Sequence, residues 1–344
     1  MKANIKKYTL KFKKPGGTSR GVLTEKETFL LLIEKDGNRG IGECSLFRGL
    51  SADDRPDYQE KLVWVCEHIE LGKDKLLEQL TEFPSIQFGV ETAFRSLESK
   101  DPFLLFPSDF TRGNDAIEIN GLVWMGKKEF MKEQIIAMIK DGFGCIKLKI
   151  GALDFSVELE LLKFIRKEFS ASDIEIRVDA NGAFDPDEAL EKLGALSEFQ
   201  LHSIEQPIKQ GQAQKMKFLC QRTPLPIALD EELIGVFDHR SKTDLLQMIK
   251  PQYIILKPGL IGGFKGSREW ISLAEKEQIG WWVTSALESN IGLNAIAQFT
   301  YGLGNTMPQG LGTGSLYTNN FDSPLKVSRG KLSYEPHTLW NFNL

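Results

Sequence analysis

The segment Gly144-Cys145-Ile146-Lys147-Leu148-Lys149 reads as a short buried strand that ends in charged residues. Four later segments share this design, with an apolar or alternating approach that ends at Asp179, Glu205, Asp230 or Lys257. These four residues follow one another at intervals of 25 to 27 residues. Each interval has room for one strand, one helix and two short loops. The series therefore predicts successive βα units of a parallel barrel, an α/β fold.

Three of the strand-end residues are carboxylates, which we predict to be metal ligands. In a parallel barrel the carboxyl ends of the strands converge on one face, so Asp179, Glu205 and Asp230 would meet there. Clustered carboxylates repel one another unless a cation neutralises them. A site with carboxylates and without Cys or His favours Mg²⁺, with Mn²⁺ as a substitute, over zinc or copper. The alternative is that these residues are solvated charges or members of ion pairs.

The lysines are candidate catalytic residues. Lys147 and Lys149 alternate along one strand, so both side chains point into the barrel mouth. A buried lysine without a partner usually has a lowered pKa and can then remove a proton from carbon at neutral pH. Lys257 precedes Pro258, which favours an extended strand end, and lies beyond the carboxylates in chain order. The alternative for the pair is a solvated face of the strand.

The chain divides by pattern into two domains. An α+β capping domain is expected over residues 1–112, and a modified barrel over residues 113–319, with residues 320–344 returning to the first domain. In the capping domain we expect strands over 4–14 and 28–35, a loop at 15–19, a turn at 36–38 and helices within 56–80 and 85–99. In the barrel we expect a first strand at 117–120, helices at 128–141, 154–169, 185–198 and 266–278, and a strand at 280–284.

Composition narrows the function classes. The 344 residues are 41% hydrophobic and 26% charged, as in an ordinary globular protein. The net charge of −4 gives no basic footprint for nucleic acid. The sequence contains no run of 18 apolar residues, so we expect no membrane span. The N-terminal residues alternate rather than form the apolar core of a signal peptide, so we expect no secretion. The four scattered cysteines favour reduced thiols, so we expect a cytoplasmic protein.

Taken together, these motifs resemble the enolase superfamily, and in particular its muconate lactonizing enzyme subgroup. The likeness covers nearly the whole chain. Its landmarks, in the family's order, are Lys147-Leu148-Lys149, Val178-Asp179-Ala180-Asn181, Ile204-Glu205-Gln206-Pro207, Leu229-Asp230-Glu231 and Leu256-Lys257-Pro258. The resemblance implies a modified TIM barrel, (β/α)₇β, with an α+β cap built from both chain ends. It also implies Mg²⁺-assisted removal of a proton next to a carboxylate, a lysine-and-metal design known for this superfamily.

Two segments narrow the resemblance further. Residues 284–292 and 312–317 are similar to those of o-succinylbenzoate synthases, which implies a hydro-lyase of menaquinone biosynthesis. Lys149 would then remove the proton and assist the departure of hydroxide, Lys257 would act from the opposite side, and Lys147 would tune Lys149. The substrate would be a small carboxylate. Its expected contacts are Ser285, Glu288, Asn290, Gly312, Thr313 and the cap residue Arg20.

The sequence leaves two other functions open. An N-acylamino acid racemase or another epimerase would use the same lysines as two bases on opposite faces. The acidic DxD pattern with which dipeptide epimerases hold an amino group is absent near Ser285. The second alternative is a catalytically inactive barrel that serves as a binding module, which loss of a lysine or ligand would favour; all of them are present.

Overall fold

The computed structural model describes residues 1–18 and 21–342 of the chain. It begins with an antiparallel sheet of β1 (Lys2–Thr18), β2 (Gly21–Lys35) and β3 (Asn38–Cys44). The predicted turn between β2 and β3 forms at Asp36-Gly37, where both residues have positive φ. The prediction of a loop at residues 15–19 is wrong for residues 15–18, the part of this range that the structure describes. After a register shift, Gly16 and Gly17 pair with β2, so β1 continues to Thr18.

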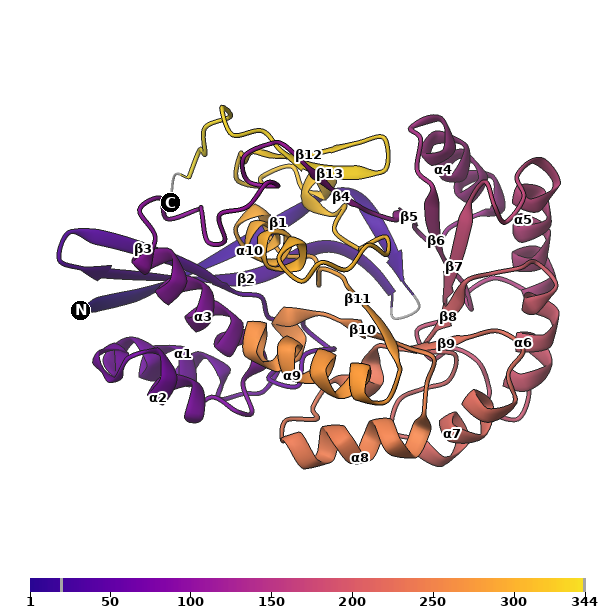
Figure 1. Ribbon diagram of the computed structural model, residues 1–344, viewed down its shortest axis with the longest axis horizontal. Coiled ribbons are helices and arrows are strands. Elements are labelled where there is room, and N and C mark those ends of the chain that lie inside the picture. The colour runs from indigo at the N-terminus through magenta and orange to yellow at the C-terminus, as the bar shows by residue number, and fades with distance from the viewer. Residues whose placement is uncertain (19–20, 343–344) are drawn as a thin grey trace.

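Three helices complete this first unit: α1 (Tyr58–Glu67), α2 (Lys73–Glu78) and α3 (Pro84–Glu98). The helix α3 packs on β3, and a Cβ atom at Gly42 would lie 1.9 Å from the carbonyl oxygen of Gly89. Only glycine allows this close approach of strand to helix. The predicted apolar stripe of α3 is buried, and it forms one core with the inner face of the sheet. Figure 1 shows α3 beside β3.

The rest of the chain alternates strands and helices, as predicted. Seven strands form a curled parallel sheet in the order β11-β10-β9-β8-β7-β6-β5. Its strands are β5 (Gly121–Val123), β6 (Cys145–Lys149), β7 (Glu175–Asp179), β8 (Ser203–Glu205), β9 (Ile227–Leu229), β10 (Tyr253–Leu256) and β11 (Gly280–Val283). The helices are α4 (Lys128–Lys140), α5 (Phe155–Glu168), α6 (Ala189–Ser197), α7 (Ala213–Arg222), α8 (His239–Ile249), α9 (Gly263–Lys276) and α10 (Asn290–Tyr301).

A two-residue segment, Gln309-Gly310, closes the curl between the edge strands. Gln309 N donates to the Glu118 carbonyl at 2.8 Å just before β5, and Gly310 N donates to the Val283 carbonyl of β11 at 2.9 Å. Parallel bridges join Ile119 to Gln309 and Thr284 to Gly310. Backbone hydrogen bonds thus join the segment before β5 to the end of β11, where an open sheet would leave unpaired edges. The expected modified barrel is confirmed.

Two boundaries predicted in the barrel are wrong. The first parallel strand begins at Gly121 rather than Ile117, because Ala116–Glu118 forms a separate strand, β4, that pairs with the chain's tail. The helix expected from Asp185 begins at Ala189, since residues 186–188 form a turn before it. The predicted helix start at Asp185 therefore lies four residues before the first residue of α6.

The tail is more regular than its sequence indicates. It contains β12 (Leu325–Ser328) and β13 (Lys331–Tyr334), an antiparallel hairpin that adds to β4. Beyond it, Trp340 stacks on Phe103 with ring centroids 4.2 Å apart, and Phe321 packs with Leu30 and Ile41 of the first sheet. Phe321 and Trp340 thus contact the first unit, whereas Leu332 and Tyr334 of the hairpin belong to the barrel core. The return of residues 320–344 to the first unit and the domain boundary after residue 112 stay predictions.

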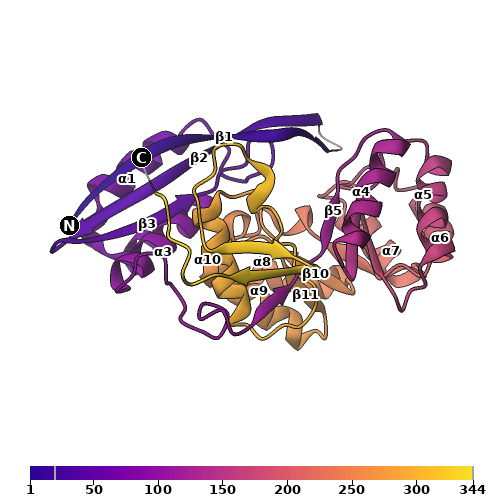
Figure 2. The same cartoon turned by 90° about the horizontal axis from the view of Figure 1, so that it is seen from above.

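The long β1–β2 ribbon reaches across the molecule towards β5 and α4, as Figure 2 shows. Near its tip, a Cβ atom at Gly16 would lie 3.0 Å from the Trp124 ring, and one at Gly17 would lie 2.5 Å from the Met125 carbonyl oxygen. The first unit therefore covers the carboxyl ends of the barrel strands. Among the described residues, no helix is long and apolar enough to cross a membrane.

Candidate active site

The predicted strand-end residues meet in one buried cluster, which we call the strand-end cluster. It consists of Lys147, Lys149, Asp179, Glu205, Asp230 and Lys257. In the parallel register, Lys149 lies beside Asp179, and Asp179 beside Glu205. The three carboxylate residues are at most 2% exposed. The strands that precede these residues are largely buried, and β7 also carries a buried charge within the strand, Arg177, which pairs with Glu175.

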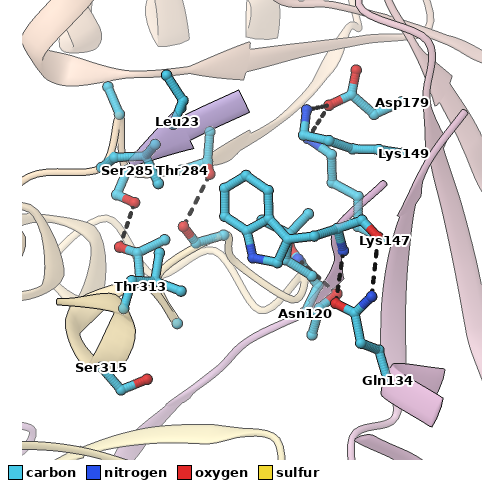
Figure 3. Close-up of a pocket in the computed structure, with 18 of the residues that line it drawn as sticks. Leu23, Asn120, Gln134, Lys147, Lys149, Asp179, Thr284, Ser285, Thr313 and Ser315 are labelled. Atoms are coloured by element: carbon cyan, nitrogen blue, oxygen red, sulfur yellow. Dashed lines mark hydrogen bonds and ion pairs between the residues drawn. The ribbon is translucent and has the colours of Figure 1, made fainter. Parts of the chain in front are cut away.

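Ion pairs connect the whole cluster. Lys149 Nζ lies 2.9 Å from Asp179 Oδ2 and donates to Asn181 Oδ1 at 2.7 Å. Lys147 Nζ lies 2.9 Å from the same Asp179 oxygen and also pairs with Glu205. Figure 3 shows the two ammonium groups converging on Asp179. Both side chains therefore point to the same side of β6, as their alternation predicts.

The third lysine reaches the cluster from the far side of the carboxylates. Lys257 Nζ pairs with Asp230 and lies 3.8 Å from Glu205 Oε1. Lys149 and Lys257 are thus separated by the carboxylates, and both line the same cavity. Two lysines on opposite sides of one cavity can act on opposite sides of one molecule bound there.

The carboxylates decide the charge of these lysines. Burial lowers the pKa of Lys147, but the negative charges of Asp179 and Glu205 outweigh it and raise the pKa. Burial likewise lowers the pKa of Lys257, and Asp230 and Glu205 reverse the effect. The expectation of a lowered pKa is therefore wrong for Lys147, because it assumes that this lysine lacks a partner.

The carboxylates respond in opposite directions. Burial raises the pKa of Asp179, but Lys147 and Lys149 outweigh it and hold the pKa well below its usual range. Burial, followed by the charge of Asp179, raises the pKa of Glu205 to about 8. Glu205 thus receives less positive charge than its neighbour does.

The donor chemistry suits a hard cation, although the described residues do not form a ready-made coordination sphere. Within residues 1–18 and 21–342, no three His, Cys, Asp or Glu side chains stand close enough together to hold a metal ion. The ammonium groups lie between the carboxylates instead. One buried oxygen, Glu205 Oε1, accepts no hydrogen bond from any described residue. Buried carboxylate oxygens with spare acceptor capacity are the ligands that Mg²⁺ prefers.

A cavity of about 760 Å³ opens above the cluster. Lys147, Lys149, Asp179, Asn181 and Lys257 line it, whereas Glu205 and Asp230 are not among its lining residues. The first unit contributes a largely apolar part of the wall. Its described members are Gly21, Val22, Leu23, Phe47, Arg48, Gly49 and Leu50. A cavity of this size holds a small organic molecule.

Three of the residues predicted to bind substrate also line the cavity: Ser285, Gly312 and Thr313. The hydroxyl groups of Ser285 and Thr313 are 2.7 Å apart and hydrogen-bonded (Figure 3). Glu288 does not line the cavity; its buried carboxylate accepts from Ala286 N at 2.7 Å.

Asn290 is also outside the lining and donates from Nδ2 to the Phe321 carbonyl at 2.6 Å. Arg20 lies outside the described residues. The substrate-binding roles of all these residues stay predictions.

Part of the wall is not indicated by the sequence. Asn120, Trp124 and Gln134 line the cavity beside β5 and α4. The Gln134 amide holds the Trp124 backbone in place, accepting from Trp124 N and donating to Trp124 O, both at 3.0 Å (Figure 3). Such a bond between a helix residue and a loop ten positions earlier leaves no periodic signal in the sequence.

Comparison with known proteins identifies the family of this chain. Residues 131–336 match the family described as "Enolase C-terminal domain-like". The chain is 47% identical to the o-succinylbenzoate synthase of Desulfotalea psychrophila, in an alignment that covers 96% of this chain and 98% of the relative. It superposes on the crystal structure of MenC from Desulfotalea psychrophila with a TM-score of 0.87 and 44% identity, covering 97% of this chain and 99% of that one.

A more distant structure shares the fold. Muconate lactonizing enzyme from Pseudomonas fluorescens superposes with a TM-score of 0.81 at 20% identity, covering 98% of this chain and 96% of that one. The near-complete coverage and high identity of the Desulfotalea relative exceed what fold likeness alone produces. The chain therefore belongs to the enolase superfamily and, within it, to the o-succinylbenzoate synthase family.

Proposed function

We propose that this protein dehydrates 2-succinyl-6-hydroxy-2,4-cyclohexadiene-1-carboxylate to o-succinylbenzoate, a step of menaquinone synthesis. The observation that carries the proposal is the pair of lysines, Lys149 and Lys257, on opposite sides of a carboxylate cluster in one cavity. The 47% identity to an o-succinylbenzoate synthase over 96% of the chain supports this substrate over others of the superfamily.

A divalent cation is part of the proposal, with Mg²⁺ the first candidate and Mn²⁺ a substitute. Asp179, Glu205 and Asp230 would hold it, and the buried Glu205 Oε1, which accepts no hydrogen bond from any described residue, supports this assignment. A dipeptide epimerase of Enterococcus faecalis that shares the fold was solved in complex with Mg. When bound, such a cation stabilises negative charge on the substrate carboxylate.

Lys149 is the proposed base. Its Nζ atom is fixed by Asp179 and by Asn181 Oδ1, so its lone pair, once the amine is neutral, has a defined direction. It would take the proton from the ring carbon that bears the carboxylate. The C–O bond to the ring hydroxyl then breaks, and the ammonium of Lys149 returns the proton to the departing oxygen. Water leaves and the ring becomes aromatic, which makes the step strongly downhill.

The other two lysines would support this chemistry. Lys257, from the opposite side, would stabilise the charge that develops as the proton leaves. Lys147 contacts Asp179 and Glu205 and would set the charge around Lys149. Its raised pKa suits a permanent cation better than a base.

The cavity wall suits the proposed substrate. Leu23, Phe47, Leu50 and Leu287 offer apolar surface to the ring, and Ser285 and Thr313 offer hydroxyl groups to the succinyl tail. Among the described lining residues outside the strand-end cluster, Arg48 carries positive charge, but it is already bound to Asp54 and Glu27 at 2.6 Å. The tail would therefore rely on polar and water-mediated contacts. The proposed partner is this small carboxylate, and the free cysteines suit the proposed cytoplasmic location.

A comparison of two substrates tests the proposal. We would measure kcat/KM for dehydration of the cyclohexadiene acid and for racemisation of an N-acylamino acid, with the same Mg²⁺-loaded protein. Dehydration should be the faster reaction. Faster racemisation, with dehydration at background, would replace this function by the epimerase alternative.

A further inference from the structure

Two carboxylates of the first unit reach across to helices of the barrel. Glu43, on β3, contacts the first residues of α10, and Glu91, on α3, contacts the first residues of α9. Helix N-termini present backbone N–H groups without partners in the helix, and a carboxylate satisfies them well. The two contacts are alike in chemistry and differ in what lies next to them, which makes them a natural pair for comparison.

Glu43 accepts four hydrogen bonds and is fully buried. Its Oε1 accepts from Ser289 N at 2.9 Å and from Thr28 Oγ1 at 2.8 Å. Its Oε2 accepts from Ser289 Oγ at 2.5 Å and from Gly292 N at 2.9 Å. A Cβ atom at Gly292 would lie 2.9 Å from Oε2, so glycine is needed for this approach. Both oxygens of Glu43 therefore face donors.

Two further charged residues surround Glu43, and we call the three the interface cluster: Lys26, Glu43 and Glu288. Glu288 Oε2 accepts from Ala286 N at 2.7 Å, and its Oε1 accepts from Ser45 Oγ of the first unit at 3.2 Å. Lys26, on β2, is 6% exposed, and the charges of Glu43 and Glu288 act on it directly. Glu43 of β3 and Ser45 just after it thus contact the loop after β11 directly, whereas Lys26 Nζ makes no hydrogen bond to a described residue and interacts with the carboxylates through its charge.

This loop forms part of the substrate cavity. Ser285, Ala286 and Leu287 line it, and Leu287 has a φ of 62°, a conformation that a non-glycine residue adopts at a cost. Such strain persists when neighbouring contacts fix the backbone. Here Ala286 N is held by Glu288, the Leu287 carbonyl accepts from Tyr317 Oη at 2.7 Å, and Ser289 N is held by Glu43.

We propose that Glu43 is a positioning residue for the substrate cavity: by holding the start of α10 from the first unit, it fixes the Ser285–Leu287 loop in its strained, substrate-contacting form. The inference rests on the proposed function for its kinetic test, but not for its structural test. In the proposed function this loop would contact the ring and tail of the substrate rather than the reacting atoms, so loss of the Glu43 contacts should weaken ground-state and transition-state binding alike. That pattern raises KM and leaves kcat nearly unchanged.

Glu91 is the matched control. It is 8% exposed and accepts from Phe264 N at 2.5 Å and Lys265 N at 3.1 Å. These residues do not line the cavity, and they lie seven and eight positions beyond Lys257. Ser289, by contrast, lies two positions beyond Leu287. Both carboxylates join the two units, but only Glu43 is next to a lining loop.

The experiment compares Glu43→Gln with Glu91→Gln. Every hydrogen bond of Glu43 is accepted from a donor. The Gln side chain has nearly the same shape, but its amide nitrogen would replace one of the two accepting oxygens and face donors instead. We expect Glu43→Gln to raise KM for the cyclohexadiene acid about tenfold or more, with kcat changed less than about threefold, since small displacements at a site are costly. Glu91→Gln should leave both constants within about twofold, because its contacts are remote from the cavity.

Amide hydrogen exchange gives the structural test without any turnover. Glu43→Gln should speed exchange at residues 285–292, and Glu91→Gln only at the start of α9. Equal KM changes in both variants, or unchanged exchange at 285–292 in Glu43→Gln, would overturn the inference. Ser289→Ala serves if Glu43→Gln does not fold. It removes one of the four hydrogen bonds of Glu43 together with the cap bond from Ile291 N to Ser289 Oγ, and it should show the same rise in KM more weakly. A wild-type protein without dehydratase activity would refute the proposed function alone, since the exchange comparison stands without it.

Discussion

The strand-end cluster and the interface cluster are both buried and ionic, yet they are stabilised in different ways. In the strand-end cluster the carboxylates are partnered mainly by three lysine side chains, which can move. In the interface cluster Glu43 and Glu288 are partnered by backbone N–H groups and hydroxyls, which are fixed by the fold. Movable partners allow protons and a cation to be exchanged, whereas fixed partners define a geometry. Of the two clusters, only the first contributes charged groups to the cavity lining.

The sharpest way to break this comparison is to remove Lys149. We expect Lys149→Ala to lower kcat by about 10⁴-fold or more, because one general acid–base group contributes roughly 10²–10⁴-fold and this residue is proposed to act twice. The fold should persist, since Asp179 keeps Lys147 as a partner. Steady-state kinetics and a thermal melt check both points. Retention of more than about a tenth of the activity would contradict the role, given that range.

Asp230→Asn tests whether the carboxylates hold a cation. It should remove most activity and weaken Mg²⁺ binding, measured by calorimetry. From the sequence alone, we would expect this substitution to raise the stability of the cation-free protein, because it removes repulsion between neighbouring carboxylates. The structure reverses this expectation, because Lys257 would lose its closest partner. Breaking a buried pair costs about 3–5 kcal/mol, so we expect cation-free stability to fall, as urea unfolding would measure. Higher stability in the variant would show that repulsion dominates.

Lys147→Ala should have a smaller effect on activity. Lys147 contacts Asp179 and Glu205 rather than the bond that breaks, so its loss acts through its neighbours. Changes to groups that orient a metal site typically cost about 10–100-fold in affinity or activity. Kinetics at several Mg²⁺ concentrations would separate the two effects. A loss as large as that of Lys149→Ala would mean that Lys147 takes part in the chemistry itself.

The smallest expected effect is on the pH dependence of stability, through two buried carboxylates that accept hydrogen bonds from backbone N–H groups. Burial raises the pKa of Glu91 and of Glu288 to about 7 from an ordinary value of 4.5. The folded state then binds more protons than the unfolded state between these values, so this contribution to stability is present below pH 4.5 and is lost as pH rises to about 7. Glu91→Gln should therefore show a smaller fall in unfolding free energy between pH 5 and pH 8 than the wild type. An equal fall in unfolding free energy in the variant and the wild type would contradict the raised pKa of the buried Glu91 carboxyl.

The sequence indicates the strand-end cluster far better than the interface cluster, and the reason is physical. Lys149, Asp179 and Glu205 each follow an apolar strand at a regular interval, so local pattern and barrel topology are enough to bring them together. Glu43 meets Ser289 across 246 positions, through packing between two units. No spacing rule predicts such a contact.

The same argument explains the wrong boundaries in the barrel. Residues 117–120 have the alternation of a strand, but that alternation does not reveal that the partner of Ile117 is Leu332 in the tail rather than a barrel strand. The local pattern identifies a strand correctly and leaves its partner undetermined. Likewise, Asp185-Pro186 marks a turn that precedes a helix as readily as a helix start.

The most direct test of the central claim is the reaction itself. Purified protein would be freed of cations by chelation and mixed with the cyclohexadiene acid, and the diene absorbance would be followed before and after Mg²⁺ is added. We predict that the absorbance falls only after the addition, with o-succinylbenzoate as the product. Turnover that is complete under exhaustive chelation, or loss of absorbance no faster than in a protein-free control with Mg²⁺, would contradict it.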